Sequence, residues 1–564
     1  MTNWTADYDE EPLRELTVTD LLRNRAEKIG DRTAVTYGPE DRAYSFSELN
    51  DVANAIANSL IEMGIEKQQK VSVMARNPLS SVLAMVGINK AGMVYSPINF
   101  EYKGEALSYQ LNDTGPEVLI VEDQYVGRLN EVVDSLEDAP TVVVIDTGTE
   151  SATLPSNLSG PTFDKLQSGD RSEPGVDVSW HDEASIVYTS GTTGMPKGVV
   201  LPYRWIFENY TLFRQQLLSD DDVVHTSLPM YHVGGVYFDL HTGWVSGAST
   251  VLWDRFSPND FWDRIDRYEA TTVTLVSVMA TWLSKHGGRD TPNTLNKVHM
   301  QPLPDDYRTV AERFGFDFVT VGFGQTESGL PIAGAIHAAQ GRDATPEDVR
   351  RGMTPNEIVD SVRDVGVPVL DEAPAERYMG EPIDPIVDVA IVDDHDEPVP
   401  AEAAGELVIR PKVAEITLKE YYGKPERTVE AFSNLWFHTG DTAYVDSEGN
   451  YCYLDRRGDI IRRRGENISS LQVQEITNKN SKVEKTAAYP VPAHEGGEDE
   501  VAISVEVVDG ERLTESDLRA FLSGEMPEFM RPKYIQFVDD IPTTKTNKME
   551  KYKLQQDFND QLGE

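Results

Sequence analysis

The chain of 564 residues is too long for one compact core, so its length predicts two or more domains. Hydrophobic residues make up 39% of the sequence, which argues against wholesale disorder. The 51 Lys and Arg residues stand against 95 Asp and Glu residues, and the formal charge of −44 argues against a surface that binds nucleic acid or docks on an anionic membrane.

The first part of the chain alternates short apolar runs with helical patterns. Residues 1–12 are acidic and lack the apolar segment of a secretory signal. Residues 17–61 predict two helices that flank a strand at 34–37. The strands expected after them lie at 71–74, 94–98, 118–121, 141–145, 224–228, 249–252, 273–276 and 318–321. Alternation of this kind predicts parallel sheets with helices on their faces. The longest apolar stretch, 273–283, is too short to span a bilayer, so we expect no integral membrane association.

From residue 387 the pattern changes to short strands separated by turns, at 389–392 and 406–409, which is typical of a small β-subdomain. The single cysteine, Cys452, excludes an intrachain disulfide. A compact α/β pattern begins near residue 459, and its expected elements are strands at 487–491 and 501–507 and a helix at 514–523. Residues 331–378 are polar and rich in Asp, Glu and Pro, and predict an insertion.

These patterns predict an α/β fold. A large N-terminal domain, residues 1–457, would combine parallel α/β layers with the small β-subdomain. A small mobile α+β domain, residues 458–564, would follow it. The sequence leaves the oligomeric state open.

The strongest chemical signal is the segment Tyr-Thr-Ser-Gly-Thr-Thr-Gly-Met-Pro-Lys-Gly-Val at residues 188–199, which follows an apolar run. Its glycines allow a tight backbone, its hydroxyls offer hydrogen-bond donors, and Lys197 supplies a mobile positive charge. A triphosphate needs this combination of convergent donors and a cation. The segment differs from the mononucleotide P-loop, because Pro196 precedes the lysine and Gly198, rather than Ser or Thr, follows it. A flexible linker would not need the ordered Pro-Lys-Gly ending.

This segment resembles the signature loop of the acyl-adenylate-forming, or AMP-binding, superfamily, which includes acyl-CoA ligases, adenylation domains of peptide synthetases and firefly luciferase. The resemblance implies that ATP binds on the loop, through Thr189, Ser190, Gly191, Thr192, Thr193, Gly194 and Lys197. Further segments resemble other motifs of the family and follow in the family's order. Taken singly, each has a plainer interpretation, such as a core histidine or a turn, but their order and spacing together favour the family.

The segment Leu-Pro-Met-Tyr-His-Val-Gly-Gly around His232 resembles the second core motif. The residue at the position of His232 there opens or closes the passage between the acyl site and the adenylate. Residues 322–327 resemble the adenine-flanking motif, to which Gln325 belongs. By resemblance, Thr326 contacts the α-phosphate and Glu327 holds Mg²⁺, a hard cation that prefers carboxylate oxygen.

Residues 436–441 resemble the motif whose aspartate, here Asp441, accepts both ribose hydroxyls, and Arg456 would assist at the ribose. Gly458 falls at the family's hinge position, about which the small domain rotates between two catalytic poses. Glycine suits a pivot, because it tolerates large changes of φ and ψ. Gly465 would line the tunnel for the pantetheine arm of CoA.

Near the C-terminus, Pro-Thr-Thr-Lys-Thr-Asn-Lys-Met at 542–549 resembles the family's terminal motif, which normally contains Gly-Lys and here contains Asn547 and Lys548. By resemblance, Lys548 bridges the carboxylate and the α-phosphate. Two anions must approach each other in this step, so their repulsion must be neutralised. Lys545 and Lys551 are alternatives, and a basic tail is the plainer interpretation.

The sequence therefore predicts an AMP-forming acyl-CoA synthetase, an acid–thiol ligase. ATP, Mg²⁺ and a small-molecule carboxylic acid would give an acyl-adenylate, and CoA would accept the acyl group. The expected catalytic residues are Lys548, Glu327, Thr326 and His232. The alternatives are a stand-alone enzyme that loads a carrier protein and a non-catalytic nucleotide-binding relative. The layout most resembles the carnitine/crotonobetaine and medium-chain acyl-CoA ligase branch of fatty acid metabolism, and the acid itself stays undetermined.

The negative charge also bears on the cellular setting. We expect a cytoplasmic protein, and the charge of −44 favours a halophilic one. In a very salty cytoplasm, screening over a few ångströms weakens the repulsion among so many carboxylates. The plainer interpretation is a solvated acidic surface that keeps the protein soluble.

Overall fold

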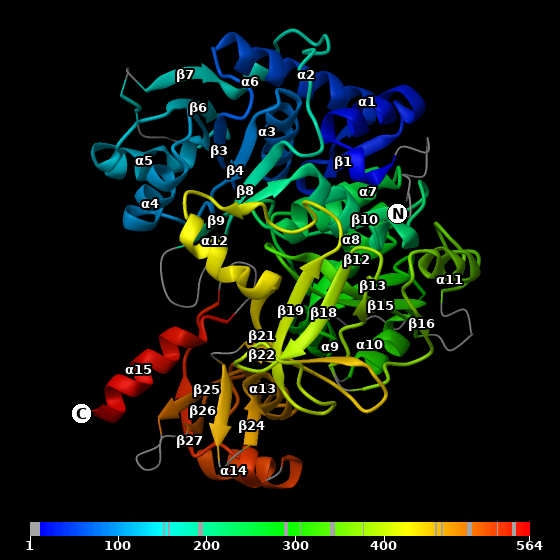
Figure 1. Cartoon of the computed structure of the whole chain (residues 1–564), viewed down its shortest axis with the longest axis vertical. Helices are drawn as coiled ribbons and strands as arrows, with labels where there is room; N and C mark the ends of the chain where they lie inside the picture. Colours follow the sequence, from blue (N-terminus) through cyan, green and yellow to red (C-terminus); the bar gives the residue numbers. More distant parts are fainter. Residues whose placement is uncertain are drawn as a thin grey trace. The chain divides into compact units, whose positions relative to one another are not determined.

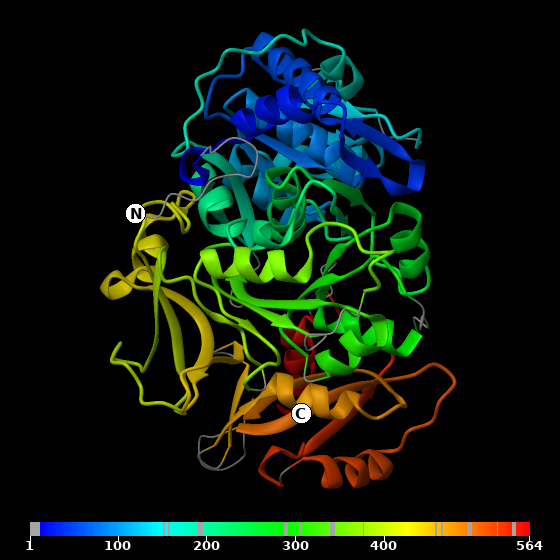
Figure 2. The same ribbon diagram turned by 90° about the vertical axis from the view of Figure 1, so that its right-hand side faces the viewer.

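The computed structural model describes residues 12–149, 153–155, 158–189, 196–286, 292–304, 306–338, 345–375, 377–456, 459–463, 466–492, 499–526, 528–543 and 549–563; Figure 1 and Figure 2 show it in two views. The chain divides into two compact units. The first unit comprises Met1–Pro374, Met379–Asp388 and Ile409–Phe437. The second comprises Ala375–Tyr378, Val389–Val408 and His438–Glu564.

One sheet of the first unit carries the candidate phosphate loop. Its strands, in spatial order, are β20 (Glu420–Tyr421), β9 (Lys197–Pro202), β8 (Glu183–Thr189), β4 (Val94–Pro97), β3 (Lys70–Met74), β5 (Val118–Glu122), β6 (Thr141–Ile145) and β7 (Ser159–Thr162). From β8 to β7 neighbouring strands run parallel, whereas β8 and β9 form an antiparallel hairpin. Strands β3 to β6 are nearly continuous apolar runs, because helices cover both faces of such a sheet.

The second sheet of the first unit is also mainly parallel. Its strands, in spatial order, are β16 (Val369–Leu370), β15 (Gly329–His337), β14 (Phe318–Gln325), β13 (Lys297–Gln301), β12 (Thr272–Val276), β10 (Val223–Thr226), β11 (Ser249–Leu252), β1 (Thr33–Tyr37) and β2 (Arg42–Ser45), with β17 (Glu381–Pro382) paired to β15. Strands β1 and β10 to β14 run parallel to their neighbours in that group. Strand β14 then turns back into antiparallel β15, which places residues 322–327, the predicted adenine-flanking motif, at the end of β14.

Helices cover these two sheets. They are α1 (Val18–Ile29), α2 (Phe46–Glu62), α3 (Pro78–Lys90), α4 (Gly104–Thr114), α5 (Val126–Val132), α6 (Phe163–Gln167), α7 (Thr242–Val245), α8 (Phe261–Tyr268), α9 (Ser277–His286), α10 (Tyr307–Phe314), α11 (Pro355–Asp364) and α12 (Pro425–Ala431). In Figure 1, α4 and α5 lie to one side of β3 to β6, and their leucines pack on β5. Helix α3 is buried almost all round, because it touches β3 and β4 of one sheet and β1 of the other.

Shorter helical segments complete the first unit. The 3-10 turns are η1 (Leu13–Glu15), η2 (Gly38–Glu40), η3 (Asp123–Tyr125), η4 (Val133–Ser135), η6 (Arg214–Leu217) and η8 (Ser433–Leu435). Two wider π-helical segments, η5 (Trp205–Tyr210) and η7 (Gly234–His241), flank β10 in sequence. Their side chains are almost all buried, and π-helical turns are frequent at functional sites.

The second unit contains two sheets and a hairpin. The first sheet has the order β18 (Val387–Val392), β19 (Gly405–Pro411), β21 (Phe437–Val445) and β22 (Tyr451–Arg456). A hairpin of β23 (Ile460–Arg463) and β24 (Glu466–Ser469) leads to the second sheet, β25 (Val483–Pro492), β26 (Asp499–Val507) and β27 (Tyr534–Val538). The helices are α13 (Ser470–Asn478), α14 (Glu515–Glu525) and α15 (Lys551–Gly563), with the 3-10 turn η9 (Glu528–Met530). Helices α13 and α14 pack with β25 and β26 in one apolar core.

The α/β fold predicted from the sequence is confirmed. Each strand expected from an apolar run is present, although β14 and β25 extend further than predicted. The predicted β-subdomain corresponds to the sheet of β18, β19, β21 and β22, and most of its residues belong to the second unit. The boundary at 457/458 stays a prediction, because both residues lie outside the described ones. Among the described residues, no helix is long and apolar enough to cross a membrane.

The predicted insertion at 331–378 begins within a strand. Residues up to His337 belong to β15, whose side chains are largely buried in the sheet, and the rest of the described segment contributes α11 and β16. Helix α11 starts at a capping box formed by Thr354 and Glu357, which satisfies backbone N–H groups at its first turn. The interpretation of the segment as an insertion stays a prediction.

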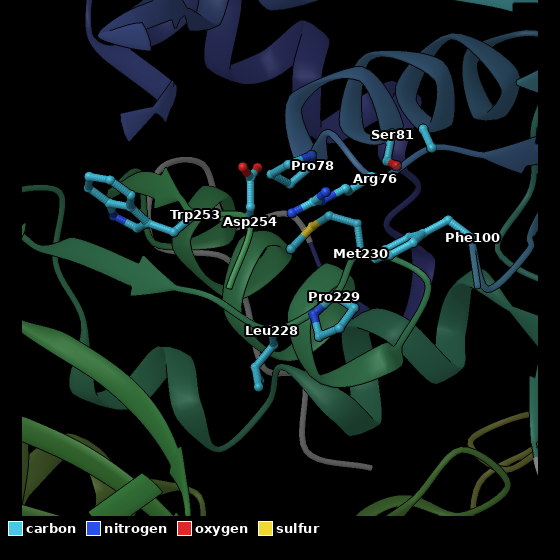
Figure 3. Close-up of a pocket in the computed structure, with 10 residues that line it drawn as sticks. Arg76, Pro78, Ser81, Phe100, Leu228, Pro229, Met230, Trp253 and Asp254 are labelled. Atoms are coloured by element: carbon cyan, nitrogen blue, oxygen red, sulfur yellow. The ribbon is translucent and has the colours of Figure 1, made fainter. Parts of the chain in front are cut away.

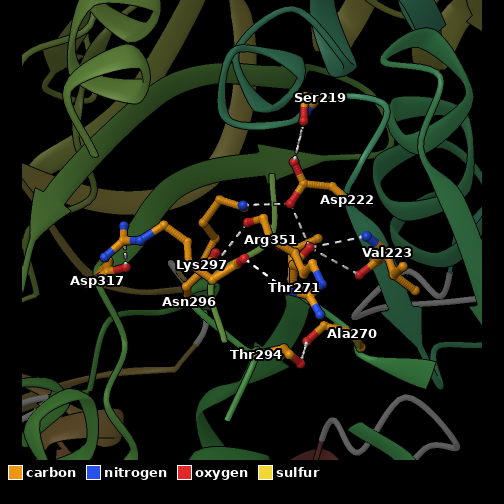
Figure 4. Close-up of polar contacts among 12 residues, drawn as sticks. Ser219, Asp222, Val223, Ala270, Thr271, Thr294, Asn296, Lys297, Asp317 and Arg351 are labelled. Atoms are coloured by element: carbon orange, nitrogen blue, oxygen red, sulfur yellow. Dashed lines mark hydrogen bonds and ion pairs between the residues drawn. The ribbon is translucent and has the colours of Figure 1, made fainter. Parts of the chain in front are cut away.

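A buried polar network lies at the amino ends of β10, β12 and β13 (Figure 4). Lys297 Nζ lies 2.6 Å from Asp222 Oδ1, and the Thr271 hydroxyl donates to the same oxygen at 2.6 Å. Asp222 also accepts from the backbone N–H of Ser219 at 2.8 Å. Gly352 approaches so closely that a Cβ there would lie 2.3 Å from the Asp222 oxygens, so this position requires glycine. The network thus joins the sheet to the loop before α11.

Three buried histidines of the first unit make its stability depend on pH. Burial lowers the pKa of His225 and His299 to about 3 and that of His241 to about 4. In the unfolded chain a histidine titrates near pH 6.5, so below that pH the unfolded state binds protons that the folded state does not. We therefore expect the free energy of unfolding to fall on acidification from about pH 6.5, by about 1.4 kcal/mol per pH unit for each histidine. Urea unfolding midpoints at constant KCl, measured between pH 7 and pH 5, check this.

Two variants separate the histidines from other acid-labile groups. His225 lies against Trp253 and Phe261, so His225→Phe keeps an aromatic ring there and should flatten the pH dependence. His181 is exposed, and His181→Gln should leave the dependence unchanged. Equal pH dependence in wild type and His225→Phe would contradict the assignment.

Candidate functional site

The β8–β9 hairpin positions the candidate phosphate loop. Thr189 ends β8 and Lys197 begins β9, and the two residues pair across the hairpin. Helix α4 holds both arms: the Tyr109 hydroxyl donates to the backbone O of Pro196 at 3.0 Å, and the Tyr188 hydroxyl donates to Asp113 at 2.9 Å. Burial raises the pKa of Tyr188 well above its ordinary value, so that hydroxyl stays protonated. The predicted loop residues Ser190, Gly191, Thr192, Thr193 and Gly194 lie outside the described residues.

Glu327, the predicted magnesium ligand, lies beside the loop in the turn after β14. Its Oε1 accepts from the Tyr421 hydroxyl at 3.1 Å and from the Thr189 hydroxyl at 3.4 Å. Lys197 Nζ lies 4.4 Å from the centre of the Tyr421 ring. The fold therefore brings Glu327 to the hairpin residues Thr189 and Lys197, which precede it by more than a hundred residues in sequence. Glu327 and Lys197 both contact Tyr421.

Asn209 of η5 holds the turn that carries Gln325, Thr326 and Glu327. Asn209 Nδ2 donates to the backbone O of Ser328 at 2.8 Å, and its Oδ1 accepts from Leu330 N at 2.8 Å. Gly329 has φ of +69°, and a Cβ there would lie 2.4 Å from Asn209. The β14–β15 turn thus requires glycine at this place, and Asn209 holds the turn in register. Thr326 is buried, whereas Gln325 and Glu327 are partly exposed.

His232 lies in the turn between β10 and η7 and is partly exposed. Its N–H donates to Pro229 O at 3.1 Å, and its own O accepts from Val236 N at 3.1 Å, so the residue leads into η7. Its ring lies 5.2 Å from that of Tyr231. Its role at a passage between acyl site and adenylate stays a prediction.

Asp441 and Arg456, the predicted ribose residues, belong to the second unit. They pair across the β21–β22 ladder. Asp441 is buried, and its Oδ1 accepts from the Tyr453 hydroxyl at 3.1 Å. Its N–H donates to Thr439 Oγ1 at 3.0 Å, which fixes the turn before it. Gly458, Gly465 and Lys548 lie outside the described residues, so their roles stay predictions.

The comparisons with known proteins cover most of the chain. The family model described as AMP-binding enzyme matches residues 22–422, and that of the AMP-binding enzyme C-terminal domain matches residues 472–548. The chain belongs to the AMP-binding enzymes. The family predicted from the loop motif is therefore confirmed.

Relatives of this AMP-binding enzyme include crotonobetaine/carnitine–CoA ligases. That of Salmonella agona (strain SL483) is 28% identical over 545 residues, which are 93% of this chain and 96% of the relative. The predicted resemblance to the carnitine/crotonobetaine branch agrees with this name. Among solved structures, the anthranilate CoA ligase AuaEII in complex with anthranoyl-AMP matches with a TM-score of 0.79 at 21% identity, over 98% of this chain and 99% of that one. ATP-bound MatB from Rhodopseudomonas palustris matches with a TM-score of 0.76 at 21% identity, over 97% and 99%. Both likenesses bear on the fold.

The residues of this AMP-binding enzyme fit Mg²⁺ in one specific way. Within the described part of the chain, no group of three or more His, Cys, Asp or Glu side chains could hold a metal ion. Mg²⁺ is commonly bound through one or two carboxylates together with substrate phosphates. Glu327 beside the phosphate loop suits this mode, because both of its hydrogen bonds end on Oε1 and, among the described residues, Oε2 accepts none.

A small hollow lies close to the His232 turn (Figure 3). It is lined by residues that follow β3, β4, β10 and β11, and ligands of α/β proteins bind at such carboxyl strand ends. Met230 and Phe100 belong to its apolar lining, and the oppositely charged Arg76 and Asp254 line it as well. The sequence did not indicate this hollow, because its residues come from four separate segments of the AMP-binding enzyme.

Proposed function

We propose that this AMP-binding enzyme is an ATP-dependent acyl-CoA ligase, which forms an acyl-adenylate from a carboxylic acid and passes the acyl group to CoA. The observation that carries the proposal is the convergence of Thr189, Lys197 and Glu327 at the β8–β9 hairpin. A hydroxyl donor, an ammonium group and a carboxylate beside one loop are the groups that a metal-bound triphosphate needs. AMP and pyrophosphate are the expected by-products.

In the first half-reaction the substrate carboxylate attacks the α-phosphorus, the bond to the bridging oxygen breaks, and pyrophosphate leaves. Lys197 and the loop hydroxyls hold the triphosphate, and Thr326 contacts the α-phosphate. Mg²⁺ held by Glu327 would neutralise phosphate charge. Lys548 offsets the repulsion between the carboxylate and the α-phosphate as they approach.

Other predicted site residues bind the ribose of ATP and admit the thiol of CoA. Asp441 accepts hydrogen bonds from the ribose hydroxyls, with Arg456 beside it on the neighbouring strand. In the second half-reaction the small domain turns about Gly458 and withdraws Lys548. The Gly465 backbone then leaves room for the pantetheine arm, and the thiol attacks the acyl carbonyl and releases AMP.

The substrate and the setting belong to the same proposal. The names of the curated relatives favour carnitine or crotonobetaine as the acid. A cytoplasmic location suits an enzyme that consumes ATP and CoA. An assay in molar KCl with Mg²⁺, ATP, CoA and a panel of acids would test the reaction, with AMP quantified. The panel runs from acetate through medium and long fatty acids to aryl acids, carnitine and crotonobetaine.

Each outcome of that assay decides between the alternatives. AMP that requires both an acid and CoA for turnover supports the ligase and names its acid. Acid-dependent exchange of pyrophosphate into ATP without any effect of CoA would favour an enzyme that loads a carrier protein. Tight ATP binding without AMP from any acid would sink the catalytic proposal and favour a non-catalytic relative.

We also propose that the protein is adapted to high salt, and expect its stability to depend on KCl. With a formal charge of −44, carboxylate repulsion is screened over about 3 Å at about 1 M salt but reaches about 10 Å at about 0.1 M. The thermal unfolding midpoint should therefore fall as KCl is lowered. Sucrose at matched osmolality is the control, because it does not screen charge. An unchanged midpoint and full activity without added salt would contradict the adaptation.

A further inference from the structure

Tyr421 contacts both charged groups of the proposed nucleotide site. Its hydroxyl donates to Glu327 Oε1 at 3.1 Å, and its ring centre lies 4.4 Å from Lys197 Nζ. The residue is only 4% exposed. The ring face of Tyr421 thus contacts Lys197, the predicted phosphate-binding lysine. Its hydroxyl contacts Glu327, the predicted Mg²⁺ ligand.

The backbone around Tyr421 is fixed to the same two elements. Strand β20 pairs antiparallel with β9, directly after Lys197, and places Tyr421 opposite Val199. The N–H of Leu418 donates to the backbone O of Glu327 at 2.7 Å. The Thr428 hydroxyl accepts from Tyr421 N at 3.0 Å. The ring is therefore held by the chain itself and does not depend on a bound nucleotide for its place.

Opposite charges beside one loop tend to pair with each other, and a direct Lys197–Glu327 ion pair would occupy the groups that ATP and its cation need. An aromatic face attracts an ammonium group without taking up a carboxylate. A phenol hydroxyl satisfies one carboxylate oxygen and leaves the other for a cation. Tyr421 offers both at once.

We propose that Tyr421 is a positioning residue that holds Lys197 on its ring face and orients Glu327 through its hydroxyl. The two charged groups then do not pair with each other, so that the Lys197 ammonium group can bind the triphosphate and the Glu327 carboxylate can bind Mg²⁺. This inference rests on the proposed function of the site. It assigns a role to a residue outside the motifs found in the sequence.

The hydroxyl and the ring make separable contributions. Tyr421→Phe keeps the ring under Lys197 and removes the hydrogen bond to Glu327. We expect the enhancement of ATP binding by Mg²⁺ to fall about tenfold, since a hydrogen bond to a charged group has about that effect, while ATP binding without Mg²⁺ stays unchanged. Tyr421→Leu also removes the ring, so ATP binding without Mg²⁺ should weaken by a further factor of about 2–5.

The neighbouring tyrosine provides a matched control. Lys70 Nζ donates to the Tyr422 hydroxyl at 2.9 Å and lies 5.4 Å from the centre of its ring, so Tyr422 also contacts a lysine, but its hydroxyl accepts from that lysine rather than donating to a carboxylate. Tyr422 has no part in the proposed site. Tyr422→Phe should therefore leave ATP binding with and without Mg²⁺, and the KM for ATP, as in the wild type.

Isothermal titration of ATP into each variant, with and without Mg²⁺, measures binding apart from turnover, and acid-dependent AMP formation is followed in parallel. Loss of the Mg²⁺ enhancement in Tyr421→Phe alone supports the inference. Equal weakening with and without Mg²⁺, or wild-type behaviour in Tyr421→Phe, would overturn it. If the wild type binds Mg²⁺ and ATP but gives no AMP with any acid, the proposed function fails, while the titrations still decide the role of Tyr421.

Discussion

Replacing Lys548 with alanine is expected to slow acyl-adenylate formation by about 10²–10³, equivalent to about 3–4 kcal/mol of transition-state stabilisation. The reason is that a carboxylate must approach an anionic phosphate, and a preorganised cation offsets that repulsion without reorganising. Formation of thioester from preformed acyl-adenylate should stay near the wild-type rate, because the proposed mechanism withdraws Lys548 in that step. The measurement is pyrophosphate exchange for the first half-reaction and single-turnover transfer to CoA for the second.

Two neighbouring lysines are the controls for that prediction. Lys551 has other partners in the structure. Its Nζ donates to Ser470 Oγ at 2.6 Å and lies 3.8 Å from Asp459. Lys551→Ala should therefore affect stability more than adenylation, and Lys545→Ala should affect neither strongly. The assignment is wrong if Lys551→Ala or Lys545→Ala abolishes exchange while Lys548→Ala does not, or if Lys548→Ala slows both half-reactions equally.

The parallel sheets of the first unit were readable from sequence for a physical reason. Strands such as β5 and β6 are buried on both faces, so they appear as short continuous apolar runs. The loop at residues 188–199 was equally readable, because its glycines, hydroxyls and lysine are contiguous. A feature whose residues are contiguous in the chain can be predicted from the sequence pattern alone.

The features that the sequence did not predict depend on contacts between distant segments. Tyr421 stands next to Tyr422, and no local pattern tells which of the two faces Glu327 and which faces Lys70. The segments η5 and η7 have buried side chains around nearly their whole circumference, so they lack the period that marks a surface helix. Nothing in the sequence around Asn209 indicates that its side chain binds the backbone of the β14–β15 turn.

Charged residues show the same limit. Lys297 and Asp222 adjoin strand starts, where the sequence suggests solvated loop positions, yet they are only 2% and 1% exposed. Their charges are matched by each other and by neighbouring donors, whereas Glu327 keeps an oxygen without a hydrogen bond among the described residues. A buried polar network in which every charge is paired, such as that of Asp222 and Lys297, contributes to stability. A carboxylate such as Glu327, with an oxygen that accepts no hydrogen bond from the described residues, indicates a binding site.

Breaking the Asp222–Lys297 pair is expected to destabilise the first unit strongly. Asp222→Ala leaves the Lys297 ammonium buried without its 2.6 Å partner and removes the acceptor of the Thr271 hydroxyl (Figure 4). Removing one member of a buried ion pair typically costs about 3–5 kcal/mol. The urea unfolding midpoint at constant KCl measures the loss. Because Gly352 packs on Asp222, the loop before α11 should also become more sensitive to proteolysis.

A double-mutant cycle separates the pair from ordinary packing. Lys297→Met should cost a similar amount to Asp222→Ala. Asp222→Ala combined with Lys297→Met should cost much less than the sum of the two single changes, because the double variant leaves no unpaired charge behind. The exposed pair of Arg410 and Asp388 is the control, and Asp388→Ala should change stability by no more than about 1 kcal/mol. Additive losses in the cycle would mean that the two charges do not interact across the amino ends of β10 and β13. The loop that contains Gly352 would then be held by its packing on Asp222 alone.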